Sequence, residues 1–336
     1  MKPAPRLVVG FDGTTAPERL LKLIASGSVA GVVIFSRNLE TTGQWLELQR
    51  TLRAAFRHHV PMIAVDQEGG LVQRLKPPKI PEVPALPPMG VLAPRLSSLQ
   101  LQALGRGVGL QLAALGFNTN FAPVLDVHSR PENPIIGERA FGTTPDAVAV
   151  RARSYWRGLE EAGVRGCVKH FPGHGDTTVD SHIALPTVSR PVESLEAIEI
   201  APFRAAIDAG VSLVMTAHVL YPALDPSHPA TLSPAVIAGL LRHRLGFRGV
   251  VISDDLDMGA VPGRDDPRQL AAALDAAGVD LALVCRDLDL AEGLAAHLRC
   301  DGDTATRVHQ LLNQLSEPRA VDEPAAIPRL DLEAFR

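Results

Sequence analysis

The chain has 336 residues, of which 46% are hydrophobic and 21% charged, and its formal net charge is −4. This composition is typical of a soluble globular protein, and it gives no electrostatic basis for binding nucleic acid or an acidic membrane surface. No stretch approaches the roughly 18 apolar residues of a membrane helix, and the run Leu7–Phe11 is too short for a signal-peptide core. We expect a cytoplasmic protein, with Cys167, Cys285 and Cys300 as reduced thiols.

Short apolar runs alternate with helix-length segments along the whole chain. Eight of these runs are predicted to be strands: Leu7–Phe11, Gly31–Phe35, Met62–Val65, Phe117–Ala122, Gly166–Lys169, Val211–Thr216, Gly249–Ser253 and Leu281–Cys285. Apolar residues recur at helical spacing in Thr41–Arg57, Ser98–Leu115, Pro145–Ala162, Val192–Ala209, Pro234–Leu245 and Pro267–Ala277. Eight strands that alternate with helices predict parallel pairing, and eight is the number that closes a barrel.

Polar residues at the strand ends favour that barrel over an open sheet. They are Asp12, Ser36–Asn38, Asp66–Glu68, Asn118, Asn120, Lys169, His170, His218, Asp254, Asp255, Arg286 and Asp287. In a (β/α)8 barrel all strand ends meet on one rim, where active sites lie. We therefore predict an α/β fold with one TIM-type barrel over residues 1–316, and a tail over residues 317–336 that packs on the barrel or extends from it.

Residues 169–182 read KHFPGHGDTTVDSH and form the densest group of reactive side chains. Asp180 could fix the tautomer of His182 and raise its basicity, which would suit proton transfer at neutral pH. Gly173 and Gly175 would let this loop close over a substrate. A surface loop with a helix-capping aspartate is the plain alternative.

A carboxylate at the end of the seventh predicted strand, Asp254, could be a nucleophile, a metal ligand or a helix cap. As a nucleophile it would suit a retaining glycosidase, which forms a covalent glycosyl intermediate. Asp66 could accept hydrogen bonds from two neighbouring sugar hydroxyls, while Arg74, Arg139 and Lys169 would supply cationic donors. For Arg139 a surface ion pair with Glu138 is an equal alternative.

Metal binding and Schiff-base chemistry are alternatives to a glycosidase site. His170, His174, Asp176 and His182 could bind a metal, but Pro172 and the glycines exclude a helix that would align the histidines. Lys169 could form a Schiff base, which would leave the histidine-rich loop without a purpose. We therefore expect neither a metal nor a cofactor.

The 169–182 segment resembles the signature of the β-N-acetylhexosaminidases of glycoside hydrolase family 3. Segments 65–70 (VDQEGG), 120–127 (NFAPVLDV), 215–218 (MTAH) and 253–256 (SDDL) fit the same pattern, so the resemblance covers nearly the whole chain. It implies a TIM-type barrel, a retaining mechanism and removal of terminal β-linked N-acetylglucosamine. In bacteria the implied substrate is a cell-wall fragment, N-acetylglucosamine linked to 1,6-anhydro-N-acetylmuramic acid and its peptides.

The resemblance also implies roles for individual residues. Asp254 is the implied nucleophile, and His182 with its partner Asp180 is the implied acid/base. The implied sugar-binding residues are Asp66, Arg74, Arg139, Lys169 and His170. Leu71 departs from the pattern, because many relatives carry a basic residue there, and the chain is too short for the second domain that some members have.

Three functions remain open from the sequence. The first is hydrolysis by a monomer acting on a small carbohydrate. The second is phosphorolysis, since a neutral histidine repels an incoming phosphate less than a carboxylate would. The third is a sugar-binding barrel without catalysis, which would have no need for a nucleophile and a dyad together. The low aromatic content of 4% favours a tight pocket for one terminal sugar.

Overall fold

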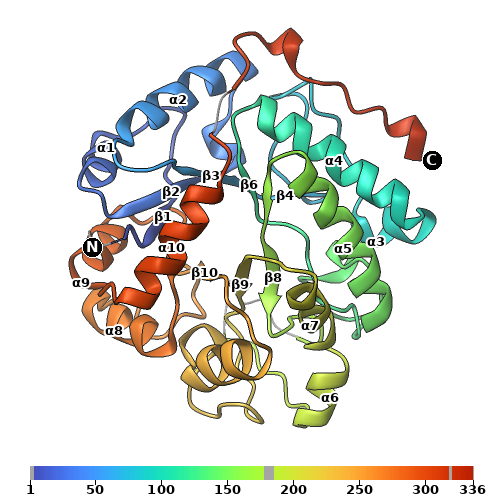
Figure 1. The fold of residues 1–336 in the computed structure, drawn as a ribbon, viewed down its shortest axis with the longest axis vertical. Helices are drawn as coiled ribbons and strands as arrows, with labels where there is room; N and C mark the ends of the chain where they lie inside the picture. The colour runs from blue at the N-terminus through green and yellow to red at the C-terminus, as the bar shows by residue number, and fades with distance from the viewer. Residues whose placement is uncertain (1–3, 178–184, 318–319, 336) are drawn as a thin grey trace.

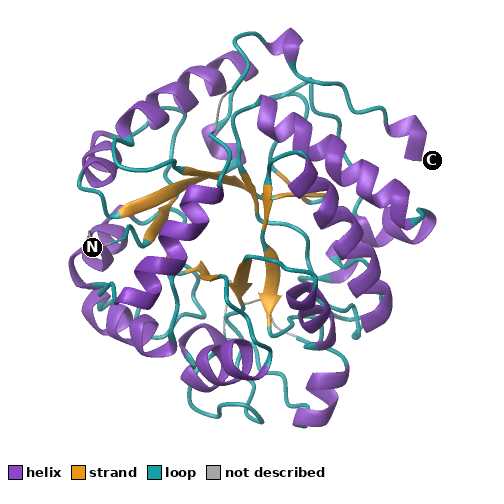
Figure 2. Ribbon diagram, viewed as in Figure 1, coloured by secondary structure: helices purple, strands orange, loops and turns teal. Residues whose placement is uncertain are grey.

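The computed structural model describes residues 4–177, 185–317 and 320–335, and its centre is a ring of parallel strands (Figures 1 and 2). The strands are β1 (Leu7–Val9), β2 (Val29–Ile34), β3 (Met62–Val65), β6 (Thr119–Asn120), β7 (Arg165–Gly166), β8 (Val168–Phe171), β9 (Leu213–Thr216), β10 (Val250–Asp255) and β11 (Leu281–Val284). β4 (Gln67–Gly69) and β5 (Val72–Gln73) form a separate antiparallel hairpin after β3.

The strand order closes into a barrel. Neighbours follow the order β7-β6-β3-β2-β1-β11-β10-β9-β8, and all these pairs are parallel. The two ends of this order, β7 and β8, are separated in the chain only by Cys167. They therefore occupy one position of the ring, which has eight positions, and the predicted (β/α)8 barrel is confirmed.

Helices surround the ring (Figure 2). They are α1 (Glu18–Ala25), α2 (Thr42–Ala55), α3 (Met89–Leu92), α4 (Ser98–Ala114), α5 (Pro145–Glu161), α6 (Val192–Ala197), α7 (Ala201–Asp208), α8 (Pro267–Ala277), α9 (Leu288–His297), α10 (Gly302–Gln314) and the π-helix η5 (Ala235–Arg244). Short 3₁₀ turns are η1 (Ser36–Asn38), η2 (Ala93–Arg95), η3 (Gly137–Arg139), η4 (Ala230–Leu232), η6 (Pro324–Ala326) and η7 (Leu332–Phe335). Within the described ranges, no helix is both long and apolar enough to cross a membrane.

The prediction of one continuous helix over Val192–Ala209 is wrong. The structure has two helices here, α6 and α7, with Pro202 in the first turn of α7. In an unbroken helix Pro202 would lack the N–H that bonds the carbonyl of Ile198, and its ring would clash with that carbonyl. The break places Glu199 between the two helices, in a fully buried position.

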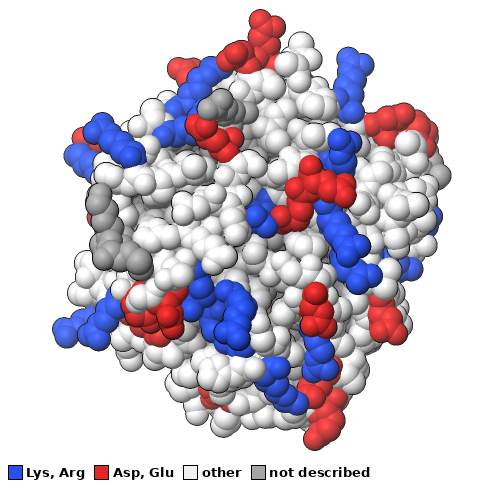
Figure 3. Space-filling view, in the orientation of Figure 1, with Lys and Arg blue, Asp and Glu red and all other residues white. Residues whose placement is uncertain are grey.

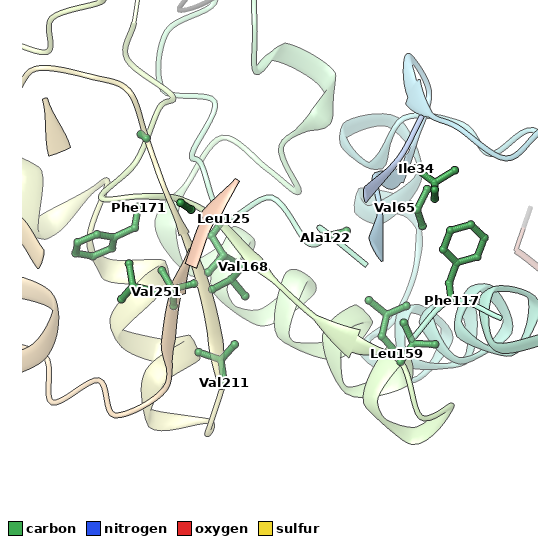
Figure 4. Packing of buried hydrophobic residues seen from close by; sticks show 14 of the residues in the cluster. Ile34, Val65, Phe117, Ala122, Leu125, Leu159, Val168, Phe171, Val211 and Val251 are labelled. Carbon is green, nitrogen blue, oxygen red and sulfur yellow. The ribbon is translucent and has the colours of Figure 1, made fainter. Parts of the chain in front are cut away.

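The core has an outer and an inner layer, because successive strand residues point to opposite faces. Leu7 and Val9 of β1 belong to the outer layer between strands and helices, whereas Val8 belongs to the barrel interior. Figure 4 shows part of the outer layer, where Ile34 and Val65 of adjacent strands lie near Phe117. Burial on both faces explains why the strands read as continuous apolar runs.

Helix α10 closes the amino-terminal end of the barrel. Its buried residues Val308 and Leu311 belong to the same cluster as the interior strand residues. Arg307 of α10 donates to the buried Asp280, which directly precedes β11, at 2.9 and 2.7 Å. In Figure 1 α10 crosses in front of the ring, and Figure 3 shows acidic and basic side chains intermixed on this face. The opposite end of the barrel, where the strands have their carboxyl ends, is left open for a functional site.

The tail after α10 lies along α4 (Figure 1). Val321 N donates to Ala114 O at 2.8 Å, and Gln111 Nε2 donates to Pro328 O at 3.0 Å. Ile327 is 5% exposed. The boundary at residue 316 between barrel and tail stays a prediction.

Candidate active site

A cavity of about 160 Å³ lies at the carboxyl-terminal ends of the strands. Six of the eight predicted catalytic and sugar-binding residues line it: Asp66, Arg74, Arg139, Lys169, His170 and Asp254. They follow or end strands β3, β8 and β10 or lie in loops beyond β3 and β6, so residues up to 188 positions apart meet in one site. The other two, Asp180 and His182, lie outside the described residues.

Lys169 is the centre of a buried ion cluster. Its ammonium lies 2.7 Å from Asp66 Oδ1 and 2.6 Å from Glu68 Oε1. Burial opposes its charge, but the two carboxylates together raise the pKa of Lys169 above its usual value. A Schiff-base lysine needs a lowered pKa so that the neutral amine can attack. This environment therefore counts against the aldolase-like alternative.

Arg139 pairs with Glu68 rather than with its sequence neighbour Glu138. Arg139 Nε and one terminal nitrogen donate to the two oxygens of Glu68 at 2.8 and 2.9 Å, a bidentate geometry. Burial by itself would raise the pKa of Glu68, but Arg139 and Lys169 hold it well below its usual range. Glu68 was not among the predicted site residues, although its place two residues after the strand-end Asp66 was a usable signal.

Asp66 is the carboxylate of this cluster with access to the cavity. Its side chain is 14% exposed, whereas that of Glu68 is 4% exposed. Arg74, which follows β5, lies 3.5 Å from Asp66 Oδ2. Glu68 thus holds the cations in place, while Asp66 and Arg74 can offer an acceptor and a donor to a ligand. Leu71 lies in the turn between β4 and β5 and is 93% exposed.

Asp126 fixes the orientation of His170. Its carboxylate accepts hydrogen bonds from the backbone N–H of His170 at 3.2 Å and of His174 at 2.6 Å, and it lies 2.7 Å from His170 Nδ1. Burial alone would raise the pKa of Asp126, but the neighbouring His170 lowers it overall. With Nδ1 held by Asp126, Nε2 is the ring nitrogen that remains for a ligand in the cavity.

The loop after β8 is tightly packed as far as Thr177. Asn133 Nδ2 donates to the carbonyls of His174 and Gly175 at 2.9 and 3.0 Å. A Cβ on Gly175 would lie 1.7 Å from Val127 O, and one on Gly173 would lie 2.6 Å from Glu199 Cβ. Close packing therefore explains both glycines, and the predicted closing motion stays a prediction.

The candidate metal ligands of this loop have other partners. Asp176 accepts hydrogen bonds from Arg130 at 2.9 Å and from Arg190 at 2.7 and 2.9 Å. His174 Nδ1 lies 2.8 Å from Thr177 Oγ1, and burial lowers the pKa of His174 to about 4. Among residues 4–177, 185–317 and 320–335, no group of three or more His, Cys, Asp or Glu side chains could hold a metal ion.

Asp254 stands at the end of β10 as an ionised carboxylate. Burial opposes its charge, but His170 and His218 nearby, together with the backbone N–H of Asp255, lower the pKa of Asp254. The N–H of Asp255 donates to Asp254 Oδ1 at 2.8 Å. A carboxylate that keeps its charge at neutral pH is what a nucleophile requires.

The adjacent carboxylate, Asp255, has a different role. Its Oδ1 accepts hydrogen bonds from the backbone N–H groups of Asp257 and Cys285, both at 3.0 Å, and so ties β10 to β11. Burial, with the nearby Asp257, raises the pKa of Asp255 to about 7. His218, a strand-end residue not chosen as a site residue, supports the same turn by its Nε2, 2.9 Å from Asp255 O.

The chain matches known proteins over most of its length. A profile of the glycosyl hydrolase family 3 N-terminal domain matches residues 9–315. A β-hexosaminidase of Xylella fastidiosa is 40% identical over 296 residues, which are 86% of each chain. β-Hexosaminidase A of Pseudoalteromonas piscicida is 36% identical over 287 residues, which are 81% of this chain but only 48% of that longer protein.

Solved structures agree with the sequence matches. NagZ from Neisseria gonorrhoeae, solved in complex with N-trifluoroacetyl-D-glucosamine, superposes with a TM-score of 0.83 at 33% identity. The match covers 94% of this chain and 92% of that one. The family resemblance seen in the sequence is thereby confirmed: the chain belongs to glycoside hydrolase family 3 and, within it, to the β-N-acetylhexosaminidase group of glycosidases.

Proposed function

We propose that this chain is a retaining exo-β-N-acetylglucosaminidase that removes terminal β-linked N-acetylglucosamine. The observation that carries the proposal is the ionised Asp254 in the same small cavity as a cluster of hydroxyl-binding groups. Retaining glycosidases need a carboxylate on one face of the sugar and a proton donor near the leaving oxygen. The β-hexosaminidase relatives, and NagZ bound to a glucosamine derivative, support this sugar specificity.

The proposed hydrolysis takes place in two steps. First, Asp254 attacks the anomeric carbon, and the aglycone oxygen leaves with a proton from His182, giving a glycosyl ester. Then His182 takes a proton from water, the water oxygen attacks the anomeric carbon, and Asp254 is released. Asp180 would hold His182 in the productive tautomer. The roles of His182 and Asp180 rest on the sequence pattern.

The remaining site residues bind the sugar. Asp66 would accept hydrogen bonds from hydroxyls, and Arg74 would donate to a hydroxyl or carbonyl oxygen. Lys169 and Arg139, held by Asp66 and Glu68, fix the position of these groups. His170 would present Nε2, because Asp126 occupies Nδ1. A cavity of about 160 Å³ suits one terminal sugar better than a polysaccharide.

We further propose a cell-wall fragment as substrate, N-acetylglucosamine linked to 1,6-anhydro-N-acetylmuramic acid and its peptides, acted on by a cytoplasmic monomer. The family resemblance implies this substrate class, and NagZ, solved with a glucosamine derivative, supports the identity of the sugar that is removed. The three cysteines form no disulfide, as is usual in a reducing compartment.

Nitrophenol release from 4-nitrophenyl N-acetyl-β-D-glucosaminide tests the proposal, in phosphate-free and in phosphate buffer with product identification. Free N-acetylglucosamine at equal rates in both buffers would support hydrolysis. Sugar 1-phosphate with a clear acceleration by phosphate would replace hydrolysis with phosphorolysis. No release in either buffer would favour a sugar-binding barrel.

A further inference from the structure

Beside the cavity, two arginines share a single carboxylate. Asp12 Oδ1 lies 2.8 Å from Arg37 Nε and 3.1 Å from Arg286 Nε. The side chain of Arg286 is 63% exposed and that of Asp12 is 60% exposed, while that of Arg37 is 26% exposed. One carboxylate cannot neutralise two guanidinium groups, so this trio, Asp12–Arg37–Arg286, carries an excess positive charge at the surface.

Two neighbouring carboxylates, Asp257 and Asp287, accept hydrogen bonds from backbone N–H groups and keep their negative charge. Asp257 Oδ2 accepts from the N–H of Arg286 and of Asp287 at 2.6 and 3.2 Å. Asp287 Oδ1 accepts from the first N–H groups of α9. Burial and the charge of Arg286 lower the pKa of Arg37, as expected where two cations stand close together.

The trio is one side chain away from the cavity. The Arg37 guanidinium lies 4.2 Å from the ring centroid of Phe35, which lines the cavity, and the Arg74 guanidinium lies 5.3 Å from the same centroid. Arg37 also donates to the carbonyl of Cys285, another lining residue, at 2.5 Å. A group leaving the cavity past Phe35 or Cys285 therefore comes within reach of Arg37 and Arg286.

The trio lies on one of the two sides to which the aglycone can extend from the nucleophile. The hydroxyl-binding cluster follows β3 and β8, and the nucleophile Asp254 ends β10. Because the anomeric carbon must lie at Asp254, the aglycone can extend over the end of either neighbouring strand, β9 or β11. In the ring, β10 is followed by β11, β1 and β2, which carry Arg286, Asp12 and Arg37.

We propose that Arg37 and Arg286 form an aglycone subsite that binds a carboxylate of the substrate. The proposal rests on the glycosidase function above and narrows it to substrates whose aglycone is anionic close to the scissile bond. The guanidinium groups would donate charge-assisted hydrogen bonds to that carboxylate, in competition with Asp12. Arg286, with most of its side chain exposed, can turn from Asp12 to the ligand.

A pair of substrates that differ in the charge of one carboxyl group, and otherwise by a single methyl group, tests the subsite. The pair is N-acetylglucosaminyl-β-1,4-N-acetylmuramic acid, which carries a free lactyl carboxylate, and its methyl ester. We expect kcat/KM to favour the acid by about three- to tenfold at low salt, the range of one exposed charge-assisted contact. In about 1 M salt the ratio of acid to ester should fall toward one, because the screening length shrinks to roughly 3 Å.

Substitutions in the trio should change the acid-to-ester ratio of kcat/KM in opposite directions. Arg286→Gln and Arg37→Gln should lower it toward one, whereas Asp12→Asn should raise it by removing the competing carboxylate. Arg37→Gln also removes the hydrogen bond from Arg37 to the Phe11 carbonyl, at 3.1 Å, and so affects the local fold. Arg286→Gln leaves that hydrogen bond in place and is therefore the cleaner test of the subsite. Arg244→Gln is the matched control, since Arg244 pairs with Glu196 away from the cavity and should leave the ratio unchanged.

The results of these experiments test the aglycone subsite and the glycosidase function separately. Hydrolysis of the ester and of the nitrophenyl substrate, with an acid-to-ester ratio of one in the wild type, would overturn the subsite alone. A ratio above one that neither arginine variant lowers would also overturn it. Failure to cleave any of these substrates would overturn the glycosidase proposal itself, and the subsite with it.

Discussion

The ammonium of Lys169 lies 2.7 Å from Asp66 Oδ1 and thereby ties the carboxyl end of β8 to that of β3, past the intervening β6. The same ammonium contacts Glu68, so one cation holds two carboxylates in a buried position. Removing one partner of such a cluster leaves unbalanced charge away from water, which is far more costly than losing a surface ion pair. This contact therefore joins the stability of the barrel to the shape of its site.

Replacing Lys169 by methionine should both destabilise the fold and weaken sugar binding. We expect the free energy of unfolding to fall by about 3–5 kcal/mol, as for other broken buried ion pairs, and KM for the nitrophenyl substrate to rise. Urea denaturation and steady-state kinetics measure the two effects. Lys22→Met is the control, since Lys22 pairs with Glu18 at an exposed position and should change stability by less than about 1 kcal/mol. Equal effects of the two substitutions would contradict the buried-cluster argument.

Replacing Asp254 by asparagine should abolish turnover and leave the fold intact. The amide keeps the shape of the side chain but cannot form the glycosyl ester, so kcat should fall by more than about a thousandfold. Circular dichroism and binding of N-trifluoroacetyl-D-glucosamine would report the fold and the pocket.

Asp255→Asn provides the comparison for Asp254→Asn. Asparagine retains the oxygen that accepts from the N–H groups of Asp257 and Cys285, so most activity should remain. Near-normal turnover of Asp254→Asn would exclude Asp254 as the nucleophile.

Replacing His182 by alanine should have an effect that depends on the leaving group. A poor leaving group needs a proton as its bond to the sugar breaks, whereas nitrophenolate leaves without one. We therefore expect kcat/KM for a disaccharide to fall by about 10²–10⁴ and that for the nitrophenyl substrate to fall much less in the first step. Equal losses on both substrates would reject His182 as the acid.

Replacing Glu199 by glutamine should stabilise the protein at high pH only. Burial raises the pKa of Glu199 from its usual 4.5 to about 7, although Arg190, whose Nε lies 3.8 Å from Glu199 Oε1, and Ser129 act to lower it. The unfolded chain loses this proton near pH 4.5 and the folded chain near pH 7. Ionisation therefore costs stability progressively between these values, fully above pH 7 and not at all below 4.5.

The effect of Glu199→Gln on stability is tested at two pH values and against a control variant. Glu199→Gln should raise the free energy of unfolding by up to about 3 kcal/mol at pH 8 and by little at pH 4, measured by urea denaturation. Glu40→Gln, at an exposed position, should be neutral at both. A Glu199 variant that is equally stable to the wild type at pH 8 would show that the buried carboxylate has partners beyond those described.

The strands could be predicted because their signal is local. Met62–Val65 was predicted with its observed bounds, since a strand buried on both faces is a continuous apolar run. The break between α6 and α7 was missed although Pro202 lies there, because the apolar spacing continues across it. Strand-end polarity identified Asp66, Lys169, His170 and Asp254 as cavity residues, since parallel strands in a barrel end on one rim.

The sequence by itself determined the barrel, the family and the residue types at the rim, because periodicity and short motifs are properties of neighbouring residues. Only the tertiary structure decided which charges pair. Arg139 binds Glu68, 71 residues away, rather than Glu138, and His170 is held by Asp126, 44 residues away. Charge pairing depends on distance in space and on burial, and both arise only when the strands have closed into their ring.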